Sequence, residues 1–316
     1  MSDKLTCVYV SDRGFLPCTS FSIASLVRYA SQPLQIIVLY TDTDTAALAK
    51  AEGYLARIGA PVTFVTVTTE AFAGLPPPKQ LPLATYGRLL MDRLLPADLA
   101  RVLYIDGDTL VDIDVAPLAQ RSLLGKPVGA VLDIGRILVG RREEAQKRLE
   151  LGPNGDYFNA GVLLIDWPQW RAKSIGEATL RALLAEPQRF VQADQCGLNY
   201  TCRGSWAQLD FCWNYQPSSV LYQDRQQAIF HFLGSRKPWV GTQNRHPMRF
   251  VQRYEALYAD SPWPEQFSKP ALPYWAKAAY RFLHNKGATR YWANRSLYHQ
   301  TAQRIADEIA AAGRAA

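Results

Sequence analysis

The expected fold follows from one stretch, Val102-Leu103-Tyr104-Ile105-Asp106-Gly107-Asp108-Thr109, in which a short apolar run ends in two acids. The apolar run predicts a buried strand. Two carboxylates at positions i and i+2 of extended backbone point the same way, so Asp106 and Asp108 can reach one cation. Oxygen ligands suit Mg²⁺ or Mn²⁺, and an ion held by few protein groups keeps positions for phosphate oxygens. Asp-Gly-Asp alone is weak evidence, because the same tripeptide is common in ordinary turns. Its position directly after a buried strand is what supports the prediction of a metal site.

Strand and helix signals alternate on either side of this stretch. Strands are expected at residues 5–10, 34–39, 61–67, 128–132 and 160–165, and helices at 18–30, 46–58 (capped by Thr45), 86–95 and 196–200. Apolar strands separated by helices predict an α/β fold with a mostly parallel sheet covered on both faces. Ligands of such sheets bind beyond the carboxyl ends of the strands. Asp12, Asp106, Asp133 and Asp166 each follow an expected strand, so we expect the site at that edge.

Composition narrows the class of protein. The 316 residues are 48% apolar, enough for one large domain with an appendage, and no apolar run reaches the length of a membrane span. The five cysteines show no C-x-x-C spacing, which disfavours a disulfide framework and a structural zinc site. The first residues lack the apolar segment of a signal peptide. These features favour a cytoplasmic protein.

The net charge of +7 is concentrated near the C-terminus. Seven basic residues and no acid lie from Lys269 to Arg304, interleaved with Trp and Tyr. We therefore expect a catalytic domain at 1–265 and a basic, aromatic-rich helical segment at 266–316. That segment either attaches peripherally to an anionic membrane at its inner face or packs its aromatic residues on the catalytic domain. The near-neutral remainder argues against nucleic-acid binding.

A phosphatase is an alternative interpretation of the acidic pair. Asp-x-Asp after an apolar strand also opens the haloacid-dehalogenase-like phosphatases, in which the first acid, here Asp106, would be the nucleophile. That family places Thr or Val four residues after the first Asp, whereas this chain has Leu110. The motif there also lies on the first strand, and here a hundred residues precede it.

Several separated segments resemble one glycosyltransferase family. They are Thr85-Tyr86-Gly87-Arg88-Leu89, residues 102–109, Tyr157-Phe158-Asn159-Ala160-Gly161-Val162, Asp194-Gln195 and His231-Phe232-Leu233-Gly234-Ser235-Arg236-Lys237-Pro238-Trp239, in that order. The set resembles glycosyltransferase family 8, particularly its bacterial lipopolysaccharide galactosyl- and glucosyltransferases. The resemblance covers residues 5–239. It implies a GT-A fold and a retaining, Mn²⁺-dependent (or Mg²⁺-dependent) transfer of a hexose from a UDP-sugar to a saccharide or glycolipid such as lipopolysaccharide.

The resemblance also implies roles for individual residues. Asp106, Asp108 and His231 would bind the metal. The implied donor-binding positions are Asp12 at the uracil ring, Phe15 at the base, Gly234 and Lys237 at the diphosphate, and Arg88, Asp106, Asp133, Asn159, Ala160 and Asp194 elsewhere on the donor. Gly14 and Gln80 depart from the residues that the family usually carries near the nucleoside.

The resemblance also identifies the residue that faces C1 of the sugar, and its chemistry implies how the acceptor attacks. A double displacement needs a carboxylate there, and the matching residue is Gln195, whose amide is a poor nucleophile. We therefore expect front-face attack by the acceptor, with Gln195 stabilising positive charge on the sugar and Asp194 as the competing nucleophile. A loop at 135–140 is expected to fold over the donor. Two further alternatives are a non-catalytic nucleotide-sugar binder and a nucleotide-sugar hydrolase.

Overall fold

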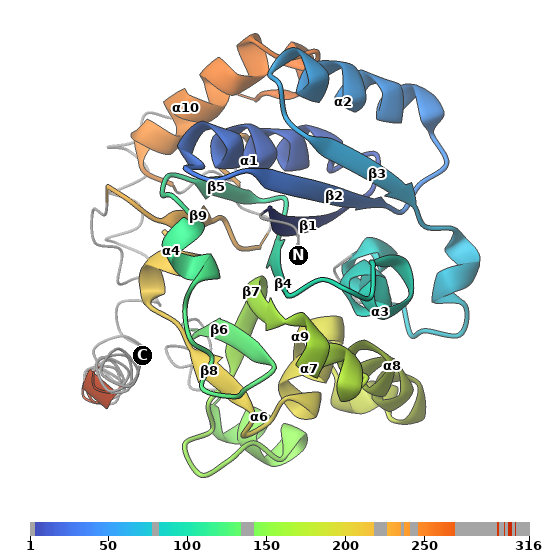
Figure 1. Cartoon of the computed structure of the whole chain (residues 1–316), viewed down its shortest axis with the longest axis vertical. Coiled ribbons are helices and arrows are strands. Elements are labelled where there is room, and N and C mark those ends of the chain that lie inside the picture. The colour runs from blue at the N-terminus through green and yellow to red at the C-terminus, as the bar shows by residue number, and fades with distance from the viewer. Residues whose placement is uncertain are drawn as a thin grey trace.

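The computed structural model describes residues 4–77, 82–133, 142–217, 226–234, 237–240 and 246–268, and five residues near the C-terminus (Ser296, Gln300, Gln303, Arg304 and Asp307). Within these residues the chain forms a seven-stranded sheet of order β3-β2-β1-β4-β7-β6-β8 and a two-stranded ribbon, β5-β9 (Figure 1). The sheet strands are β1 (Leu5–Ser11), β2 (Leu34–Tyr40), β3 (Val62–Thr66), β4 (Arg101–Ile105), β6 (Val128–Leu132), β7 (Phe158–Asp166) and β8 (Trp206–Gln208). The ribbon strands are β5 (Thr109–Val111) and β9 (Ile229–His231).

The sheet is mixed and mostly parallel, which confirms the predicted class. β1 pairs parallel with β2 and with β4, β2 pairs parallel with β3, and β8 pairs parallel with β6. β7 is antiparallel to both β4 and β6. β1 has β2 on one side and β4 on the other, so the strand order reverses there. Ligands of open α/β sheets bind beyond the strand ends at such a reversal.

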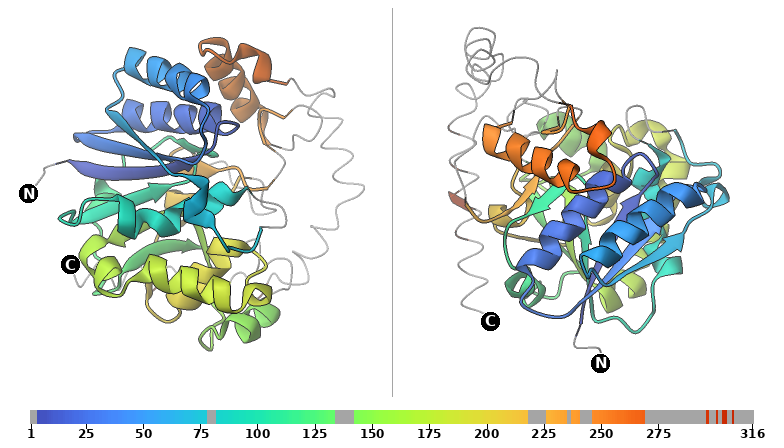
Figure 2. Two further views of the ribbon diagram at one scale, coloured as in Figure 1. Left: turned by 90° about the vertical axis from the view of Figure 1, so that its right-hand side faces the viewer. Right: turned by 90° about the horizontal axis from the view of Figure 1, so that it is seen from above.

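Helices cover both faces of the sheet (Figure 2). On one face, α1 (Leu16–Tyr29), α2 (Thr45–Arg57) and α10 (Met248–Ala259) contribute to one apolar core. On the other, η2 (Leu83–Leu90), α3 (Met91–Leu94), α7 (Trp167–Ala172), α8 (Ile175–Ala185) and α9 (Ala193–Thr201) contribute to a second core. The remaining described elements are η1 (Thr69–Phe72), α4 (Ala116–Ala119), α6 (Arg142–Leu149), η3 (Pro187–Arg189), η4 (Phe211–Asn214) and η6 (Pro264–Gln266).

β4 shows why the strand before the acidic pair is apolar throughout. Successive side chains of a strand point to opposite faces. Leu103 and Ile105 pack into the core with α1, and Val102 and Tyr104 pack into the core with η2 and α8. All four side chains are buried, and each buried aliphatic side chain stabilises the fold by about 1.5–3 kcal/mol. The Asp-Gly-Asp turn therefore follows a strand that is packed between the two cores.

The antiparallel direction of β7 corrects one expectation. Asp166 was expected at the same edge as Asp106, but its partner in the sheet is Arg101, at the start of β4. Asp166 therefore lies at the opposite edge, where its side chain accepts a hydrogen bond from Gln169 N (3.1 Å) and caps α7. The start of β7 lies at the site edge instead, and it carries Asn159.

Three helical expectations also differ in detail. The cap of α2 is Asp44 rather than Thr45, because the Asp44 side chain accepts from Ala47 N at 2.9 Å. The stretch expected at 86–95 is divided between the end of the 3-10 helix η2 and one turn of α-helix, α3. The helix expected at 196–200 begins at Ala193, which places Asp194 and Gln195 in its first turn.

Most of the C-terminal segment lies outside the described residues, as do the loop at 135–140 and Gln80. The domain boundary near 265 therefore stays a prediction. Arg304 forms an ion pair with Asp156 of the main domain, with 2.7 Å between Arg304 Nη2 and Asp156 Oδ1. A search of the described residues finds no helix that is both long and apolar enough to cross a membrane.

Candidate functional site

The ribbon of β5 and β9 brings His231 to the acidic pair. β5 begins directly after Asp108 and pairs antiparallel with β9, so that Thr109 lies opposite His231. Phe232 N donates a hydrogen bond to Asp108 O at 3.0 Å, which continues the pairing past the strand end. The backbone hydrogen bonds of the ribbon thus fix His231 beside two residues that are distant in sequence.

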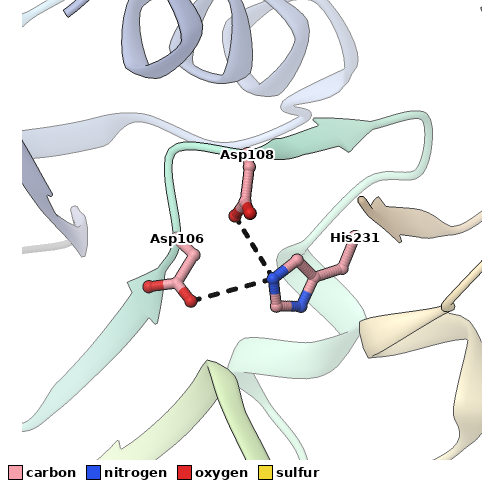
Figure 3. Close-up of side chains that lie close together, drawn as sticks. All are labelled: Asp106, Asp108 and His231. Atoms are coloured by element: carbon pink, nitrogen blue, oxygen red, sulfur yellow. Dashed lines mark ion pairs between the residues drawn. The ribbon is translucent and has the colours of Figure 1, made fainter. Parts of the chain in front are cut away.

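Asp106, Asp108 and His231 point toward one another (Figure 3). One ligand atom from each residue lies within 4.8 Å of those of the other two. His231 Nε2 is 3.2 Å from Asp108 Oδ1 and 3.8 Å from Asp106 Oδ2. The imidazole is buried, and both carboxylates are partly exposed. The cluster can therefore hold a cation on its buried side and leave the other side open to a ligand.

Asp106 is oriented by two donors on its other oxygen. Asp106 Oδ1 accepts from Tyr104 Oη (2.7 Å) and from Arg88 Nη2 (2.9 Å), so Oδ2 is the oxygen that faces His231. The Arg88 guanidinium also lies over the Tyr104 ring, with its carbon 4.4 Å from the ring centroid. Orientation by a second layer of hydrogen bonds is typical of metal-ligating carboxylates.

Arg88 links Asp106 to the buried Asp194. Arg88 Nε is 2.8 Å from Asp194 Oδ2, and Thr85 Oγ1 donates to Asp194 Oδ1 at 2.7 Å. Burial raises the pKa of Asp194, and Arg88 opposes that shift. For Arg88, burial lowers the pKa, but Asp106 and Asp194 outweigh it and hold the guanidinium charged. Asp194 thus has a hydrogen bond on Oδ1 and an ion pair on Oδ2, and its side chain is 2% exposed.

Asp108 has a cationic partner of its own in Lys237. The Lys237 ammonium donates to Asp108 Oδ2 and to the carbonyl of Phe232. Burial raises the pKa of Asp108, but Lys237 and His231 outweigh burial and hold that pKa well below its usual range. Asp108 is therefore ionised and can bind a cation. Gly234, in the same segment, has a φ of 71°, a backbone conformation that favours glycine.

The chemistry of the donor set fits a divalent ion. Two carboxylate oxygens and one imidazole nitrogen lie close enough together to bind a single ion. Carboxylates suit Mg²⁺ and Mn²⁺, and the imidazole extends the set toward transition metals such as Mn²⁺. Among the described residues, no other group of three or more Asp, Glu, His or Cys side chains brings its ligand atoms this close together.

A second polar group lies at the same edge of the sheet. Gln195 Nε2 donates to Asp133 Oδ2 (3.1 Å), and its Oε1 accepts from Ala160 N (3.0 Å). Asn159 Nδ2 donates to Asp133 Oδ2 at 3.4 Å. Arg88 Nη1 donates to the Ala160 carbonyl, which connects this group to the metal-ligand cluster. The structure thus brings together predicted residues from the end of β6, the start of β7 and the first turn of α9.

The end of β1 packs against the Asp-Gly-Asp turn. Asp12 Oδ1 accepts from Phe15 N at 2.9 Å and so shapes the turn into α1. A Cβ on Gly107 would lie 3.2 Å from Phe15 Cδ1 and 2.3 Å from Thr19 Oγ1. Phe15 therefore lies beside the Asp-Gly-Asp turn, Asp12 reaches it only through Phe15 N, and the close approach that requires Gly107 is to Thr19 of α1. Phe15 is partly buried against the core, so it combines core packing with a place at the site.

Sequence reasoning gave no role to two residues that shape this site. Tyr104 was treated only as part of an apolar strand, although its position two residues before Asp106 places both on one face. Asn214 lies at the end of η4, and its Oδ1 is 2.9 Å from His231 Nδ1. The segment 209–214 resembles the family's segment near the acceptor cleft, but no local sequence signal predicts the contact of Asn214 with His231, because that contact depends on the tertiary structure.

The sequence is similar to a known protein family and to several named bacterial proteins. The sequence model of the family described as glycosyl transferase family 8 matches residues 6–243. General stress protein A of Bacillus subtilis is 29% identical over 211 residues, or 61% of this chain and 71% of that protein. Lipopolysaccharide 1,2-glucosyltransferase of Escherichia coli is 27% identical over 292 residues, or 85% and 82% of the two chains. Lipopolysaccharide 1,3-galactosyltransferase of Salmonella typhimurium is 25% identical over 274 residues, or 83% and 80%.

Solved structures share the fold. An active-site mutant of LgtC superimposes with a TM-score of 0.70 at 24% identity, covering 82% of this chain and 96% of that one. The galactosyltransferase LgtC in complex with donor and acceptor sugar analogues gives 0.69 at 23% identity, covering 87% and 99%. These likenesses confirm the predicted GT-A fold.

Proposed function

The chain belongs to glycosyl transferase family 8, and on that premise we propose that it transfers galactose or glucose from a UDP-sugar to a saccharide acceptor. The observation that carries this proposal is the convergence of Asp106, Asp108 and His231 at the ends of β4 and β9. Two relatives are named lipopolysaccharide glucosyl- and galactosyltransferases, which favours lipopolysaccharide or another glycolipid as the acceptor.

The metal would be held by Asp106 Oδ2, Asp108 Oδ1 and His231 Nε2, and we propose Mn²⁺, with Mg²⁺ as a substitute. When bound, a divalent ion supplies Lewis-acid stabilisation of the negative charge that develops on the departing diphosphate. Lys237 can share that task, because its ammonium already lies beside Asp108. Gly234 would let the backbone approach the diphosphate closely.

The group around Asp133 is proposed to bind the donor sugar. Asp133, Asn159 and Gln195 present carboxylate and amide groups, which are directional partners for sugar hydroxyls. Their mutual hydrogen bonds hold these side chains in place before a sugar arrives. Phe15, which lies beside Gly107, would contact the ring face of the uracil, and Asp12, which accepts from Phe15 N, would contact its edge.

We propose retention through front-face attack. The acceptor oxygen forms the new bond to C1 as the bond from C1 to the β-phosphate oxygen breaks. The electron pair of the broken bond and the acceptor proton both pass to the departing UDP. The Gln195 oxygen would stabilise the positive charge on the sugar. Asp194 is a poor candidate for a covalent nucleophile, because its side chain is buried, its Oδ1 accepts from Thr85 and its Oδ2 is paired with the Arg88 cation.

The C-terminal segment is proposed to attach the enzyme peripherally to an anionic membrane. Its basic and aromatic residues are typical of an interfacial segment. Such attachment would bring the active site to a lipid-linked acceptor at the inner face of the membrane.

The test is UDP release from UDP-galactose, UDP-glucose and related donors, with Mn²⁺ or with EDTA, for wild type and Asp108→Asn. We expect slow, donor-selective release that EDTA abolishes and that Asp108→Asn lowers by about 10²–10³-fold, the loss typical of a removed electrostatic stabiliser. The matched control is Asp98→Asn, because Asp98 is exposed and precedes the far end of β4. The control should retain wild-type release.

Other outcomes would point to other functions. Release that is insensitive to both EDTA and Asp108→Asn would contradict the proposed metal site. Mn²⁺-dependent binding of a UDP-sugar without turnover, even with acceptors, would favour a nucleotide-sugar binder. Hydrolysis of phosphate monoesters that requires Asp106 would favour the phosphatase.

A further inference from the structure

On the side of His231 that faces away from the acids, the polar partner among the described residues is Asn214. His231 Nδ1 and Asn214 Oδ1 are 2.9 Å apart, and both side chains are buried, at 3% and 1% exposure. The backbone holds the two residues side by side. Tyr215 N donates to Ile229 O, and His231 N donates to Tyr215 O, both at 2.8 Å.

A chain of hydrogen bonds fixes the direction of this contact. Gly161 N donates to Asn159 Oδ1 at 3.0 Å, and a backbone N–H can only donate, so the Asn159 oxygen must face it. Asn214 Nδ2 donates to that same oxygen at 2.9 Å. The Asn214 oxygen must then face His231 Nδ1, which therefore carries a hydrogen. In the neutral ring this leaves the lone pair on Nε2, the atom that faces Asp106 and Asp108.

Packing restricts the same imidazole. A Cβ on Gly161 would lie 2.1 Å from His231 Cε1 and 2.5 Å from Nδ1, so the ring lies against the bare backbone of β7. Gly161 O also accepts from Asp106 N at 2.7 Å. One residue of β7 thus sets the position of a carboxylate ligand and of the imidazole.

We propose that Asn214 is a positioning residue that fixes the tautomer and orientation of His231 for metal binding. This inference rests on the proposed function. Through Asn159, Asn214 also connects the metal ligands to the residues proposed to bind the donor sugar. Without Asn214, Nδ1 and the Asn159 oxygen each lose a partner, and the ring can place its hydrogen on Nε2, where it blocks a ligand position.

The experiment measures Mn²⁺ binding directly, by the electron paramagnetic resonance signal of free Mn²⁺ titrated against the full chain without substrate. Asn214→Leu removes the acceptor and keeps a branched side chain, and we expect a 10–100-fold weaker affinity, as is usual when the partner of a ligating histidine is lost. Asn214→Asp keeps an acceptor for Nδ1 but loses the bond to Asn159. It should bind Mn²⁺ within about threefold of wild type even if its stability falls.

Asn199→Leu is the matched control for the loss of a buried asparagine. Asn199 is equally buried, at 1% exposure, and bonds to Phe158 backbone and Gln195 O rather than to a metal-ligand side chain. It should lose stability and keep its Mn²⁺ affinity. Equal losses of Mn²⁺ affinity in Asn214→Leu and Asn214→Asp, or no loss in either, would overturn the positioning role.

Nitrogen-15 NMR of the imidazole separates this inference from the proposed function. In metal-free wild type, at a pH where the ring is neutral, we expect the His231 signals of the Nδ1–H tautomer, and in Asn214→Leu a mixture of tautomers. If wild type does not bind Mn²⁺, the proposed metal site fails, and the tautomer still decides the role of Asn214. A wild-type ring with its hydrogen on Nε2 would overturn that role.

Discussion

At the scale of single residues, the Asp-Gly-Asp turn is held by contacts on every side. Tyr104 and Arg88 occupy one oxygen of Asp106, and Lys237 contacts one oxygen of Asp108. The second oxygen of each acid, Asp106 Oδ2 and Asp108 Oδ1, faces His231. Between the acids, Gly107 lies so close to Thr19 that a side chain has no room. The turn is therefore positioned before any ligand binds.

Gly107→Ala should lower the free energy of unfolding by about 1–3 kcal/mol, because its Cβ would lie 2.3 Å from Thr19 Oγ1. Unfolding in urea measures this loss, and the same variant should bind Mn²⁺ more weakly because the two acids move apart.

Removing the obstructing atoms in Gly107→Ala/Thr19→Ala should make the double variant less destabilised than the sum of the two single variants. Strictly additive losses would show that the contact with Thr19 does not matter. Gly53→Ala is the control, because no atom lies within 4 Å of its added Cβ within α2, and it should gain about 1 kcal/mol.

At the scale of elements, two arrangements build the site. β7 runs against its neighbours, so the strand begins at the edge where β4 and β6 end and brings Asn159 beside Asp133. The ribbon of β5 and β9 places His231 beside the turn that follows β4. Helix α9 then presents Gln195 from its first turn. Each element brings its polar residue to one edge of the sheet.

The start of α2 tests the assignment of its cap. Asp44→Ala should lower the free energy of unfolding by about 1 kcal/mol, because Ala47 N loses its side-chain acceptor. Thr45→Ala should change it by less than about 0.5 kcal/mol. Asp44→Asn keeps the capping oxygen and removes only a 3.9 Å ion pair with exposed Arg13, so it should stay near wild type. Thermal or urea unfolding of the three variants distinguishes the cap, and a larger loss in Thr45→Ala than in Asp44→Ala would refute it.

At the scale of the whole molecule, the sheet joins two halves for which we propose different tasks. The parallel half, from β3 to β4, carries Asp12, Phe15 and the acidic pair, which are the proposed nucleotide and metal contacts. The half with β7, β6 and β8 carries Asp133 and Asn159, which are the proposed sugar contacts. Arg88 crosses between the halves by pairing with Asp106 and Asp194. Arg304, one of the few described residues of the basic C-terminal segment, forms an ion pair with Asp156 of this domain.

Removing residues 270–316 should lower binding to vesicles of anionic lipid by at least tenfold, because each basic residue near such a surface contributes about 1 kcal/mol. Sedimentation with vesicles of phosphatidylglycerol or of phosphatidylcholine measures the difference, and raised salt should weaken binding of the full chain. UDP release by the shortened chain, compared with the full chain, checks that its active site remains intact. Equal vesicle binding by an active shortened chain would instead favour a segment that only packs on the catalytic domain.

The sequence by itself determined the features that depend on local periodicity. Apolar runs and their spacing predicted β1, β2, β4 and β6, and the i and i+2 positions placed Asp106 and Asp108 on one side of the chain. The resemblance to family 8 named His231, and the family membership is confirmed, while the roles of the site residues stay predictions. Tertiary structure alone decided the direction of β7, which moved Asp166 to the far edge, and the pairing of Asn214 with His231. The physical reason is that strand direction and side-chain contacts arise from packing between elements, whereas periodicity reports only which face of one element is buried.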